Sequence, residues 1–367
     1  MLEGSGLSGP GSARTELIAH FPDPVRWNEL LSRSLEDTLF LRAEFLQPAW
    51  KTIESQKPIY HTEVCDASGR LIGAGLFIKR PGSILSFVGA DPGDYLDIIT
   101  DSRLSSADAY QVKRMVISDV LAVAKARSVY LPHLVDVCMT PLALKDAEQT
   151  FYVTAVRTMP APAMDLTQAK IDRASFRRVE NRLARQGKVE FHHWKKAEDV
   201  VPRLEGFFDL HRRRWQGTKC GEYFTHAQNR DFFFALAESL GQTPWLRYAE
   251  IRLDGRLAAA HFGFRYRDRL VWYKPAFEIE LAKLSPGVAI IHRLIDAAMD
   301  EGAAELDFTI GGEAFKSRYA NVERHVHDMH VSTSWWAANR LRGEMMARRW
   351  VRRMINRFSN RSSSDRC

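Results

Sequence analysis

Residues 284–319 read LSPGVAIIHRLIDAAMDEGAAELDFTIGGEAFKSRY, and this stretch decides the fold. Ser285 is a good helix N-cap, and Pro286 suits the first helical position, where its missing N–H breaks no hydrogen bond. An apolar face then recurs with helical spacing up to Gly302, a residue type that favours helix ends. The members of this face are Val288, Ile291, Leu294, Ile295, Ala298 and Met299. The pattern predicts a helix over 286–301.

A short strand over 304–308 and a glycine-rich turn follow this helix, and the turn carries Glu313, Lys316 and Arg318. A turn of small residues that opens a helix leaves backbone N–H groups free, and such groups can bind a phosphate or pyrophosphate. The same pattern is typical of an ordinary turn–helix–strand unit packed on a sheet. Both interpretations remain open for the stretch taken alone.

The composition indicates a soluble globular protein of about two domains. The chain has 367 residues, of which 45% are hydrophobic and 26% are charged. No apolar run approaches the ~20 residues that a membrane-spanning helix needs. Residues 1–14 are Gly-rich and lack the apolar core of a signal peptide, so we expect a disordered leader there. The four cysteines match neither a disulfide framework nor a metal-ligand spacing, which favours a cytoplasmic location.

Positive charge is concentrated at the C-terminus. Residues 335–367 contain nine Arg and two acidic residues, whereas the rest of the chain has equal numbers of basic and acidic residues. This distribution argues against DNA as a partner and indicates a local cationic tail. Over 347–358, one arc of a projected helix is apolar and the other carries five Arg. Such a helix suits an anionic membrane surface, an anionic regulatory nucleotide, or docking on the protein's own body.

Two regions of the chain share one pattern. Residues 63–89 and 250–275 each read as three strands joined by turns, and in each the first turn ends in Gly followed by Arg-Leu. A helix and a further strand follow each region. These are predicted at 107–126 and 129–131 in the first half, and at 286–301 and 304–308 in the second. A tandem duplication of one α/β unit explains the repetition.

The segment 172–188 is a basic helical sequence between the two halves. It is either a solvated connecting helix or a helix whose Arg residues line a groove for an anionic substrate or cofactor. A strand over 189–194 and helices over 197–214 and 226–240 follow it. The first of these helices ends in three candidates for substrate binding at the domain junction, which are His211, Arg214 and Trp215.

Six motifs in combination resemble those of one family. They are LSFVGADPGDYLDII (85–99), FRRVENRLARQGKVEF (176–191), HRRRW (211–215), DGRLAAAHFGFRY (254–266), VWYKPAFEIELAKLSPG (271–287) and LDFTIGGEAFKSRY (306–319). Over residues 40–331 the chain resembles the GNAT-superfamily acyltransferases associated with cellulose and exopolysaccharide biosynthesis, and more distantly the Fem-type peptidyltransferases. The resemblance implies an α/β (α+β) protein with two tandem GNAT-like modules. Each module is a mixed, mostly antiparallel sheet flanked by helices.

We therefore expect four segments. They are the leader (1–14), a degenerate GNAT-like module (15–170), a GNAT acyltransferase module (171–334) and the basic amphipathic tail (335–367). The resemblance implies acetyl-coenzyme A as co-substrate, with its pyrophosphate at the start of the helix after the fourth strand. Ser285, Gly287, Val288 and Ala289 match that position, although Leu284 replaces the usual Gln or Arg. Fem-type relatives use aminoacyl-tRNA instead, so the donor stays open.

The same resemblance implies that backbone N–H groups near Trp272, Tyr273 and Lys274 stabilise the thioester oxygen. Candidates for the proton acceptor are His261, Glu278, Asp307 and Glu313, because an imidazole or carboxylate in the cleft can take a proton from the nucleophile. His261 has a structural alternative as a hydrogen-bonded core histidine, and Asp307 has one as a cap or turn carboxylate.

Glu313 and Lys316 resemble the family's Gly-Glu-Tyr-Lys ending, with Phe315 in place of the tyrosine. In this interpretation Lys316 holds an anionic acceptor or a donor phosphate, and Arg318 binds substrate. The histidines at 325, 327 and 330 lack a carboxylate at ligand spacing, so we expect no metal.

The sequence thus predicts a cytoplasmic GNAT-type N- or O-acetyltransferase, peripheral at the inner face of the membrane if the tail binds there. Its acceptor would be a sugar or an exopolysaccharide precursor. The alternatives are a Fem-like peptidyltransferase that uses aminoacyl-tRNA, and a non-catalytic regulatory module that binds a ligand.

Overall fold

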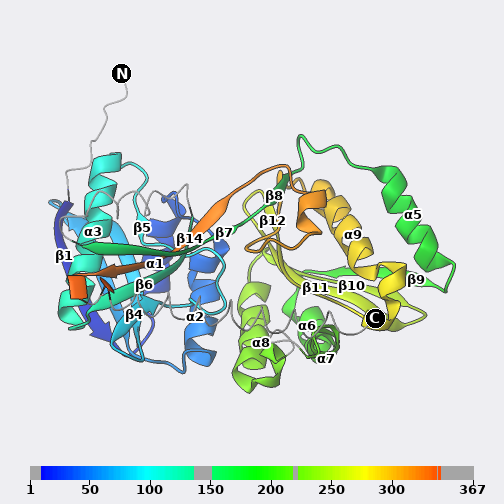
Figure 1. Ribbon diagram of the computed structural model, residues 1–367, viewed down its shortest axis with the longest axis horizontal. Coiled ribbons are helices and arrows are strands. Elements are labelled where there is room, and N and C mark those ends of the chain that lie inside the picture. The colour runs from blue at the N-terminus through cyan, green and yellow to red at the C-terminus, as the bar shows by residue number, and fades with distance from the viewer. Residues whose placement is uncertain (1–9, 136–150, 218–221, 337, 340–367) are drawn as a thin grey trace, which may run out of the picture.

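The computed structural model describes residues 10–135, 151–217, 222–336 and 338–339. Figure 1 shows two lobes side by side, each built on its own sheet. The strands of the first sheet are β1 (Pro10–Ile18), β2 (Ile59–Asp66), β3 (Leu71–Arg80), β4 (Ile84–Phe87), β5 (Ile99–Thr100), β6 (Ser128–Val135), β7 (Tyr152–Pro160) and β14 (His325–Ser332). Its helices are α1 (Pro24–Ser32), α2 (Ala43–Thr52) and α3 (Ser106–Val123), with a 3-10 turn η1 (Leu39–Leu41). We call this sheet and its helices the first module.

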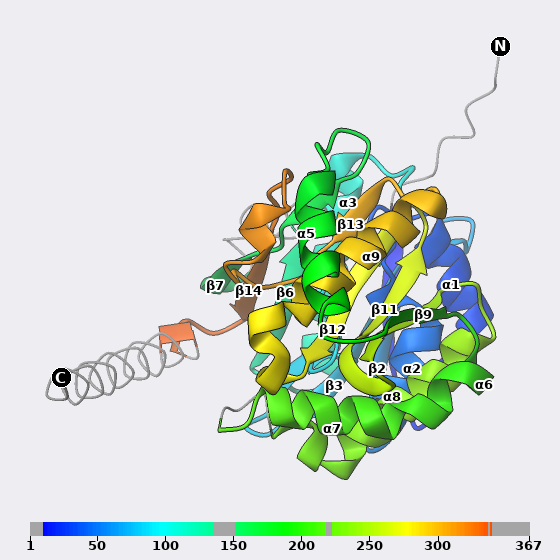
Figure 2. The same cartoon turned by 90° about the vertical axis from the view of Figure 1, so that its right-hand side faces the viewer.

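The second module contains the strands β8 (Ala163–Asp165), β9 (Val189–Trp194), β10 (Leu246–Leu253), β11 (Arg256–Tyr266), β12 (Arg269–Phe277) and β13 (Glu305–Asp307). Its helices are α5 (Arg173–Ala184), α6 (Ala197–Val200), α7 (Leu204–Arg214), α8 (Ala227–Gly241) and α9 (Pro286–Asp300). Short 3-10 turns are η3 (Val201–Arg203), η4 (Tyr223–Thr225), η5 (Ile279–Leu284) and η6 (Lys316–Arg318). Helices α5 and α9 lie over one face of the sheet, and α6, α7 and α8 lie over the other (Figures 1 and 2).

The predicted duplication is confirmed by the strand topology. In the first module β1 to β4 form an antiparallel series, and α3 then leads to β6, which is parallel to β4. In the second module β9 to β12 form an antiparallel series, and α9 then leads to β13, which is parallel to β12. Both units thus have four antiparallel strands, a crossover helix and a parallel fifth strand. The structure is a tandem pair of GNAT-like modules, as the sequence predicts.

The expected division into contiguous modules is wrong at two strands, because each sheet takes one strand from the other half of the chain. Strand β14 comes from the end of the second half, but it lies between β6 and β7 of the first sheet. Strand β8 precedes the expected boundary at 170/171, but it pairs with β13 of the second sheet. The exchange joins the two modules by backbone hydrogen bonds in both directions.

Two terminal predictions have different outcomes. Part of the expected leader is ordered, because β1 begins at Pro10 and pairs with β2. The predicted amphipathic helix at 347–358 lies outside the described residues.

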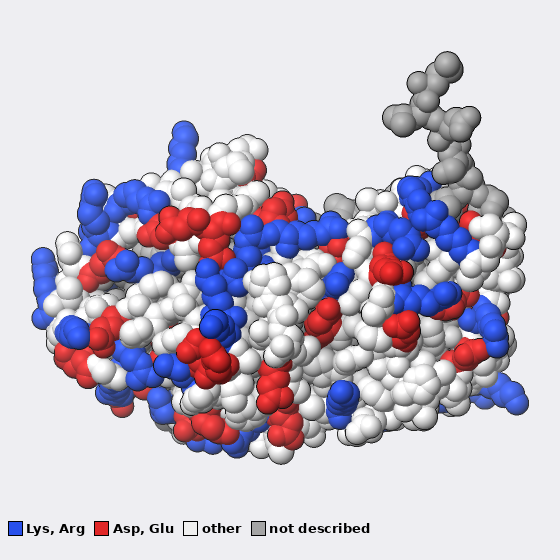
Figure 3. Space-filling model, turned by 180° about the vertical axis from the view of Figure 1, so that it is seen from behind, with Lys and Arg blue, Asp and Glu red and all other residues white. Residues whose placement is uncertain are grey.

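None of the described helices is long and apolar enough to cross a membrane. On the face seen in Figure 3, basic and acidic side chains are interspersed, in agreement with the balanced charge of the chain before residue 335.

The two modules share a hydrophobic core. Phe40 and Phe45 of the first module pack on Tyr273 and Phe264 of the second, with ring centroids 5.7 Å apart for Phe40–Tyr273 and 6.3 Å apart for Phe45–Phe264. Helices α2 and α8 meet at the same boundary, where the Phe45 and Phe232 rings are 5.5 Å apart. Burial of this much aromatic surface stabilises one relative arrangement of the modules. The site described next depends on that arrangement.

Candidate acyl-transfer site

The central strands of the second module separate halfway along their length. Strands β12 and β13 pair only over Arg269–Val271 and Glu305–Asp307. An irregularity in the pairing of β11 with β12 lies directly after Val271, opposite Gly263. Beyond it, β12 continues along β11 while the chain after Asp307 turns away. The backbones of residues 272–277 and 308–316 are therefore no longer paired, and we call the region between them the gap. At its inner end the Thr309 hydroxyl donates to the Trp272 carbonyl (3.3 Å).

A loop of the first module fills the inner end of this gap. The Tyr273 hydroxyl donates to the Pro92 carbonyl (2.7 Å), and the Tyr95 hydroxyl donates to Asp307 Oδ1 (2.7 Å). The His133 ring donates from Nδ1 to the Gly93 carbonyl (2.7 Å). Three hydrogen bonds thus hold residues 92–95, and they place Asp94 against the second module.

Asp94 is half-buried and surrounded by positive charge. Burial raises the pKa of its carboxyl above the ordinary value, and the Lys274 ammonium is the strongest opposing influence. His133 and Lys316 act in the same direction as Lys274, and so does the Thr309 hydroxyl, which itself donates to the Trp272 carbonyl (3.3 Å). We call these five residues the Asp94 cluster. A carboxyl with a raised pKa inside a gap between strands is suited to accept a proton.

Two hydrogen-bond donors of the second module, Lys274 and Tyr223, lie near Asp94. The Lys274 ammonium lies 4.9 Å from the Tyr273 ring centroid and 5.2 Å from that of Tyr223. The Tyr223 hydroxyl is buried, and it has no hydrogen-bond partner among the described residues. Burial, together with Asp91 and Asp94, raises the pKa of this phenol, so it remains a donor at neutral pH. Lys274 and Tyr223 are therefore able to stabilise negative charge that develops beside Asp94.

The outer end of the gap meets the start of α9. Pro286 occupies the first turn as predicted, but Ser285 adopts a left-handed conformation (φ 62°), and its side chain does not cap the helix. Its hydroxyl instead accepts a hydrogen bond from Arg182 Nη1 of α5 (3.2 Å). The backbone at this helix start is therefore not covered by a capping side chain. In the first module the N-terminus of the matching helix α3 is capped, because the Ser105 hydroxyl accepts a hydrogen bond from the Asp108 N–H.

A second arginine reaches the same helix start. The Arg214 guanidinium of α7 lies 4.3 Å from the Phe277 ring centroid. That ring packs against Gly287, where an added Cβ would approach it to 2.8 Å. Arg182 and Arg214 supply the positive charge that Leu284 does not. Arg182 of the predicted basic helix thus lies at the start of α9, and the groove-lining role of this helix stays a prediction.

His261 is not the base that its sequence context suggests. The ring is fully buried, stacks on Trp272 at 4.5 Å and accepts the Tyr273 N–H at Nε2 (3.2 Å). Burial lowers the pKa of His261 to about 3, so the ring is neutral near pH 7 and holds the irregular part of β12. The sequence misleads here because a histidine after three alanines gives no measure of burial.

The backbone amides of β12 also differ from the prediction. The Glu278 N–H donates to β11, so alternation directs the N–H groups of residues 274 and 276 to β11 as well. Position 275 faces the gap but is proline, which has no N–H. The Tyr273 N–H is taken by His261. These amides are therefore unavailable to a thioester oxygen. Of the predicted donor-site residues on β12, Trp272 and Tyr273 are buried, with Trp272 against Phe315 and the Tyr273 hydroxyl on the Pro92 carbonyl, whereas Lys274 is partly exposed.

The predicted carboxylates and Lys316 have structural partners. Asp307 is buried and accepts hydrogen bonds from Tyr95 and from the Thr309 N–H (2.8 Å). The Lys316 ammonium donates to the Ile310 carbonyl (2.9 Å) and pairs with Glu313 (2.9 Å). Lys316 thus fixes the turn beside Asp94, and Glu313 lies on its exposed side. A further candidate, Glu278, is buried and is paired with Arg213 and Arg256.

The remaining predicted residues divide between the site and its surroundings. His211 is buried, and burial with Lys274 and Arg214 nearby lowers its pKa to about 4, so it does not bind anions as a cation. Trp215 lies under the Arg214 guanidinium, 4.6 Å from it. Arg318 is exposed on η6. Val288 and Ala289 follow Gly287 in the first turn of α9, where Ala289 is buried.

Asp94, Tyr223 and Arg182 were not predicted as individual site residues. Asp94 belongs to the GADPGDYLD segment of a motif that carries the family resemblance, and this motif is the sequence feature that could have identified Asp94 as a site residue. Nothing in the local sequence indicates that this loop of the first module enters the gap in the second. Among the described residues no group of three or more His, Cys, Asp or Glu side chains is arranged to hold a metal ion.

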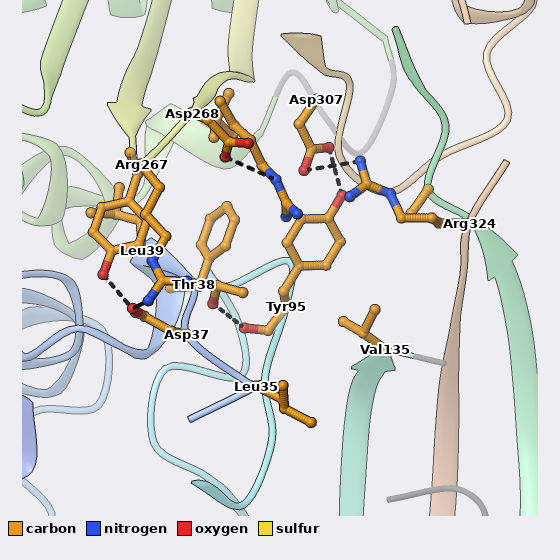
Figure 4. Close-up of a pocket in the computed structure, with 15 residues that line it drawn as sticks. Leu35, Asp37, Thr38, Leu39, Tyr95, Val135, Arg267, Asp268, Asp307 and Arg324 are labelled. Carbon is orange, nitrogen blue, oxygen red and sulfur yellow. Dashed lines mark hydrogen bonds and ion pairs between the residues drawn. The ribbon is translucent and has the colours of Figure 1, made fainter. Parts of the chain in front are cut away.

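A cavity of about 400 Å³ lies between the modules on the other side of Tyr95. Its charged lining is balanced in number, with Asp37, Asp268 and Asp307 facing Arg267, Arg269 and Arg324. In Figure 4, Tyr95 and Arg324 point toward Asp307, and Arg267 points toward Asp37 on the opposite wall. Thr309 connects the cavity with the Asp94 cluster, because its N–H donates to Asp307 and its hydroxyl lies near Asp94.

Comparison with known proteins agrees with this geometry. Residues 172–317 match the family described as acetyltransferase (GNAT) domain. No curated protein matches the chain significantly. Among solved structures, L-PGS from Bacillus licheniformis is 13% identical with a TM-score of 0.56, over 93% of this chain and 99% of that one. FemX is 11% identical with a TM-score of 0.56, over 87% of this chain and 96% of that one. A protein of unknown function from Bacteroides thetaiotaomicron is 13% identical with a TM-score of 0.57, over 87% and 100% of the two chains.

These similarities in structure concern the fold, since the sequence identities are low. The matched family domain contains the separating strands, α9 and both arginines at its start. Residues 172–317 are thus similar to a GNAT acetyltransferase domain, and they make up the larger part of the second of two GNAT-like modules.

Proposed function

We propose that this protein is an acyltransferase that moves an acyl group, most simply acetyl, from coenzyme A to an amino or hydroxyl group. One observation carries the proposal. A gap between parallel strands holds a carboxylate at its inner end, and its outer end meets an uncapped helix start beside two arginines. Acetyl-coenzyme A fits such a gap, with its pyrophosphate at the outer end and its thioester at the inner end.

Each group has a role in this reaction. Arg182, Arg214 and the start of α9 bind the pyrophosphate, and the arm of the coenzyme lies along β12. The acceptor attacks the thioester carbonyl, the carbon–sulfur bond breaks, and Asp94 takes the proton of the acceptor. Lys274 and the Tyr223 hydroxyl donate to the charge that develops on the oxygen or on the leaving sulfur. The residues support direct attack, without a covalent enzyme intermediate.

We further propose that the acceptor is a sugar or a sugar-containing precursor of an exopolysaccharide. The cavity beside Tyr95 supports this proposal, because its carboxylates and guanidinium groups are balanced in number and suit a ligand without net charge. A hydroxyl group both donates and accepts, so a polyhydroxyl ligand can pair with both kinds of side chain. The volume of about 400 Å³ is within the usual range for small-molecule pockets.

A second candidate is aminoacyl transfer of the Fem type. The shared fold with FemX and L-PGS favours it, and the start of α9 with two arginines also suits the phosphates of an RNA. The two candidates differ in the donor, so a donor-binding measurement separates them.

Calorimetric titration of acetyl-coenzyme A is the first test. We expect saturable binding to the wild-type protein and about tenfold weaker binding to Gly287→Ala, because the added Cβ displaces the Phe277 ring at the helix start. Gly206→Ala on α7 is the matched control, since its Cβ has room, with the nearest contact at 4.0 Å. Absence of binding to the wild-type protein would argue against the coenzyme A proposal. Binding of aminoacyl-tRNA under the same conditions would favour the second candidate, and binding of neither donor would favour a regulatory module.

The acceptor is tested by steady-state transfer with sugars, amino sugars and peptides at saturating acetyl-coenzyme A. We expect Arg269→Ala to raise KM for the productive sugar about tenfold and to leave the donor Kd unchanged, because Arg269 lines the cavity and not the donor gap. Arg265→Ala, on β11 outside the cavity lining, serves as the control. Transfer to peptides alone, or an unchanged KM in Arg269→Ala, would remove the cavity from the proposal.

A further inference from the structure

Three aromatic side chains are exposed together at one end of the first sheet. Trp335 and Trp336 are 50% and 77% exposed, and their ring centroids are 4.7 Å apart. Tyr152, at the start of β7, is 43% exposed. It pairs with Ser332 at the end of β14, three residues before Trp335. We call these three residues the aromatic patch.

The neighbouring strand ends of the same sheet carry cations. Ser332 also pairs with Ser128, and its hydroxyl donates to the Arg127 carbonyl (2.9 Å). Arg127 and Lys125 are exposed, and the Lys79 ammonium reaches the Ala124 carbonyl (3.2 Å) from β3, on the other side of β4. Three cations thus lie along the end of the sheet that carries the aromatic patch.

The chain that follows the patch adds more positive charge. Residues 335–367 contain nine Arg and two acidic residues. In Figure 2 the described residues that directly follow β14 lie at the edge of the molecule, in agreement with the exposure of both tryptophan side chains.

From these observations we infer that this end of the first sheet docks on an anionic lipid surface. Tyr and Trp are the residues that favour the boundary between lipid headgroups and acyl chains, because one part of each ring system is apolar and another is polar. The flanking Lys and Arg side chains supply the attraction to anionic headgroups. An apolar protein partner would explain the tryptophans but not the cations around them, and a nucleic acid would explain the cations but not two exposed indoles.

The inference is independent of the proposed chemistry, because the aromatic patch lies on the first module and the acyl-transfer gap opens in the second. The inference predicts where the proposed enzyme acts, which is on an anionic membrane surface. An enzyme held on an anionic membrane by this end would meet acceptors that are themselves carried on lipid.

Co-sedimentation of the full chain with vesicles tests the inference. We expect the protein to pellet with phosphatidylcholine vesicles that contain phosphatidylglycerol and to remain in solution with phosphatidylcholine alone. Trp335→Ala/Trp336→Ala should weaken partitioning about tenfold or more, through loss of buried indole surface. Lys125→Glu/Arg127→Glu should weaken it as well, and added salt should weaken wild-type binding. Fluorescence quenching by brominated lipid in the wild-type protein should disappear in the double tryptophan variant.

Leu17→Ala/Val25→Ala is the matched control, because it removes two exposed apolar side chains from another part of the first module. Thermal unfolding of every variant confirms that the fold is kept. Equal pelleting of the wild-type protein and the double tryptophan variant would overturn the inference, even if deletion of residues 340–367 abolished binding. Equal binding to neutral and anionic vesicles would also overturn it.

Discussion

Asp94→Asn is expected to lower kcat by about 10²- to 10⁴-fold and to leave the Kd for acetyl-coenzyme A unchanged. The substitution keeps the shape of the side chain and removes its ability to take a proton. The donor is bound by α9 and its two arginines, at the other end of the gap, so its affinity does not depend on Asp94. Stopped assays of transfer and calorimetry of the donor measure the two quantities separately.

The dependence on pH gives a second measurement of the same role. Burial raises the pKa of Asp94, and the base works only when it is ionised. Wild-type kcat/KM should therefore fall as the pH is lowered through this raised pKa, and this acid limb should be absent from the residual activity of Asp94→Asn. A raised pKa also means that ionised Asp94 is less favourable in the folded state than in the unfolded state. The contribution of Asp94 to stability is present at low pH and is lost as the pH rises through the raised pKa, so Asp94→Asn should not lower the Tm at pH 7.

Asp91→Asn is the matched control for this experiment. It lies three residues earlier in the same loop, and it is exposed and paired with Arg80. The substitution makes the same change in charge without touching the gap, so kcat should stay within about twofold of the wild-type value. If Asp94→Asn retained a comparable kcat, the proton would have to leave by another route.

The sequence predicts the elements of this fold better than their arrangement. The strand at 189–194 and the helix that begins at Pro286 form where predicted, because alternation, helical spacing and capping residues are local signals. The exchange of β14 and β8 between the sheets is not predictable in this way. Each strand has an ordinary local pattern, and its partner is set by long-range pairing. The segment 10–14 is a strand only because β2 offers it an edge.

The same distinction explains the site. Gly287 lies in the first turn of α9, at the position that the family resemblance implies for the donor, because one turn sets it. Arg214 was predicted to bind substrate at the domain junction, but its guanidinium lies against Phe277 beside this helix start. Asp94 lies in a loop with the composition of any turn, and its environment comes from Lys274 and Thr309 of the other module. His261 shows the opposite error. Its residue type suits catalysis, but the surrounding packing makes the ring a neutral part of the core.

Arg182→Ala/Arg214→Ala is expected to raise the Kd for acetyl-coenzyme A about 10²-fold, with a smaller change in kcat at saturating donor. A charge-assisted hydrogen bond to phosphate contributes about 1.5–3 kcal/mol when well made, and solvent exposure of Arg182 reduces that value. Each single variant should therefore weaken binding about tenfold, and the effect should shrink as ionic strength rises. Arg178→Ala/Arg212→Ala is the matched control, since these arginines lie on the same two helices but pair with Asp172 and Asp209. If both double variants bound the donor equally well, the start of α9 would hold it without these two side chains. If only the Arg182/Arg214 pair mattered, two helices that flank the GNAT turn would supply the charge that Leu284 does not carry.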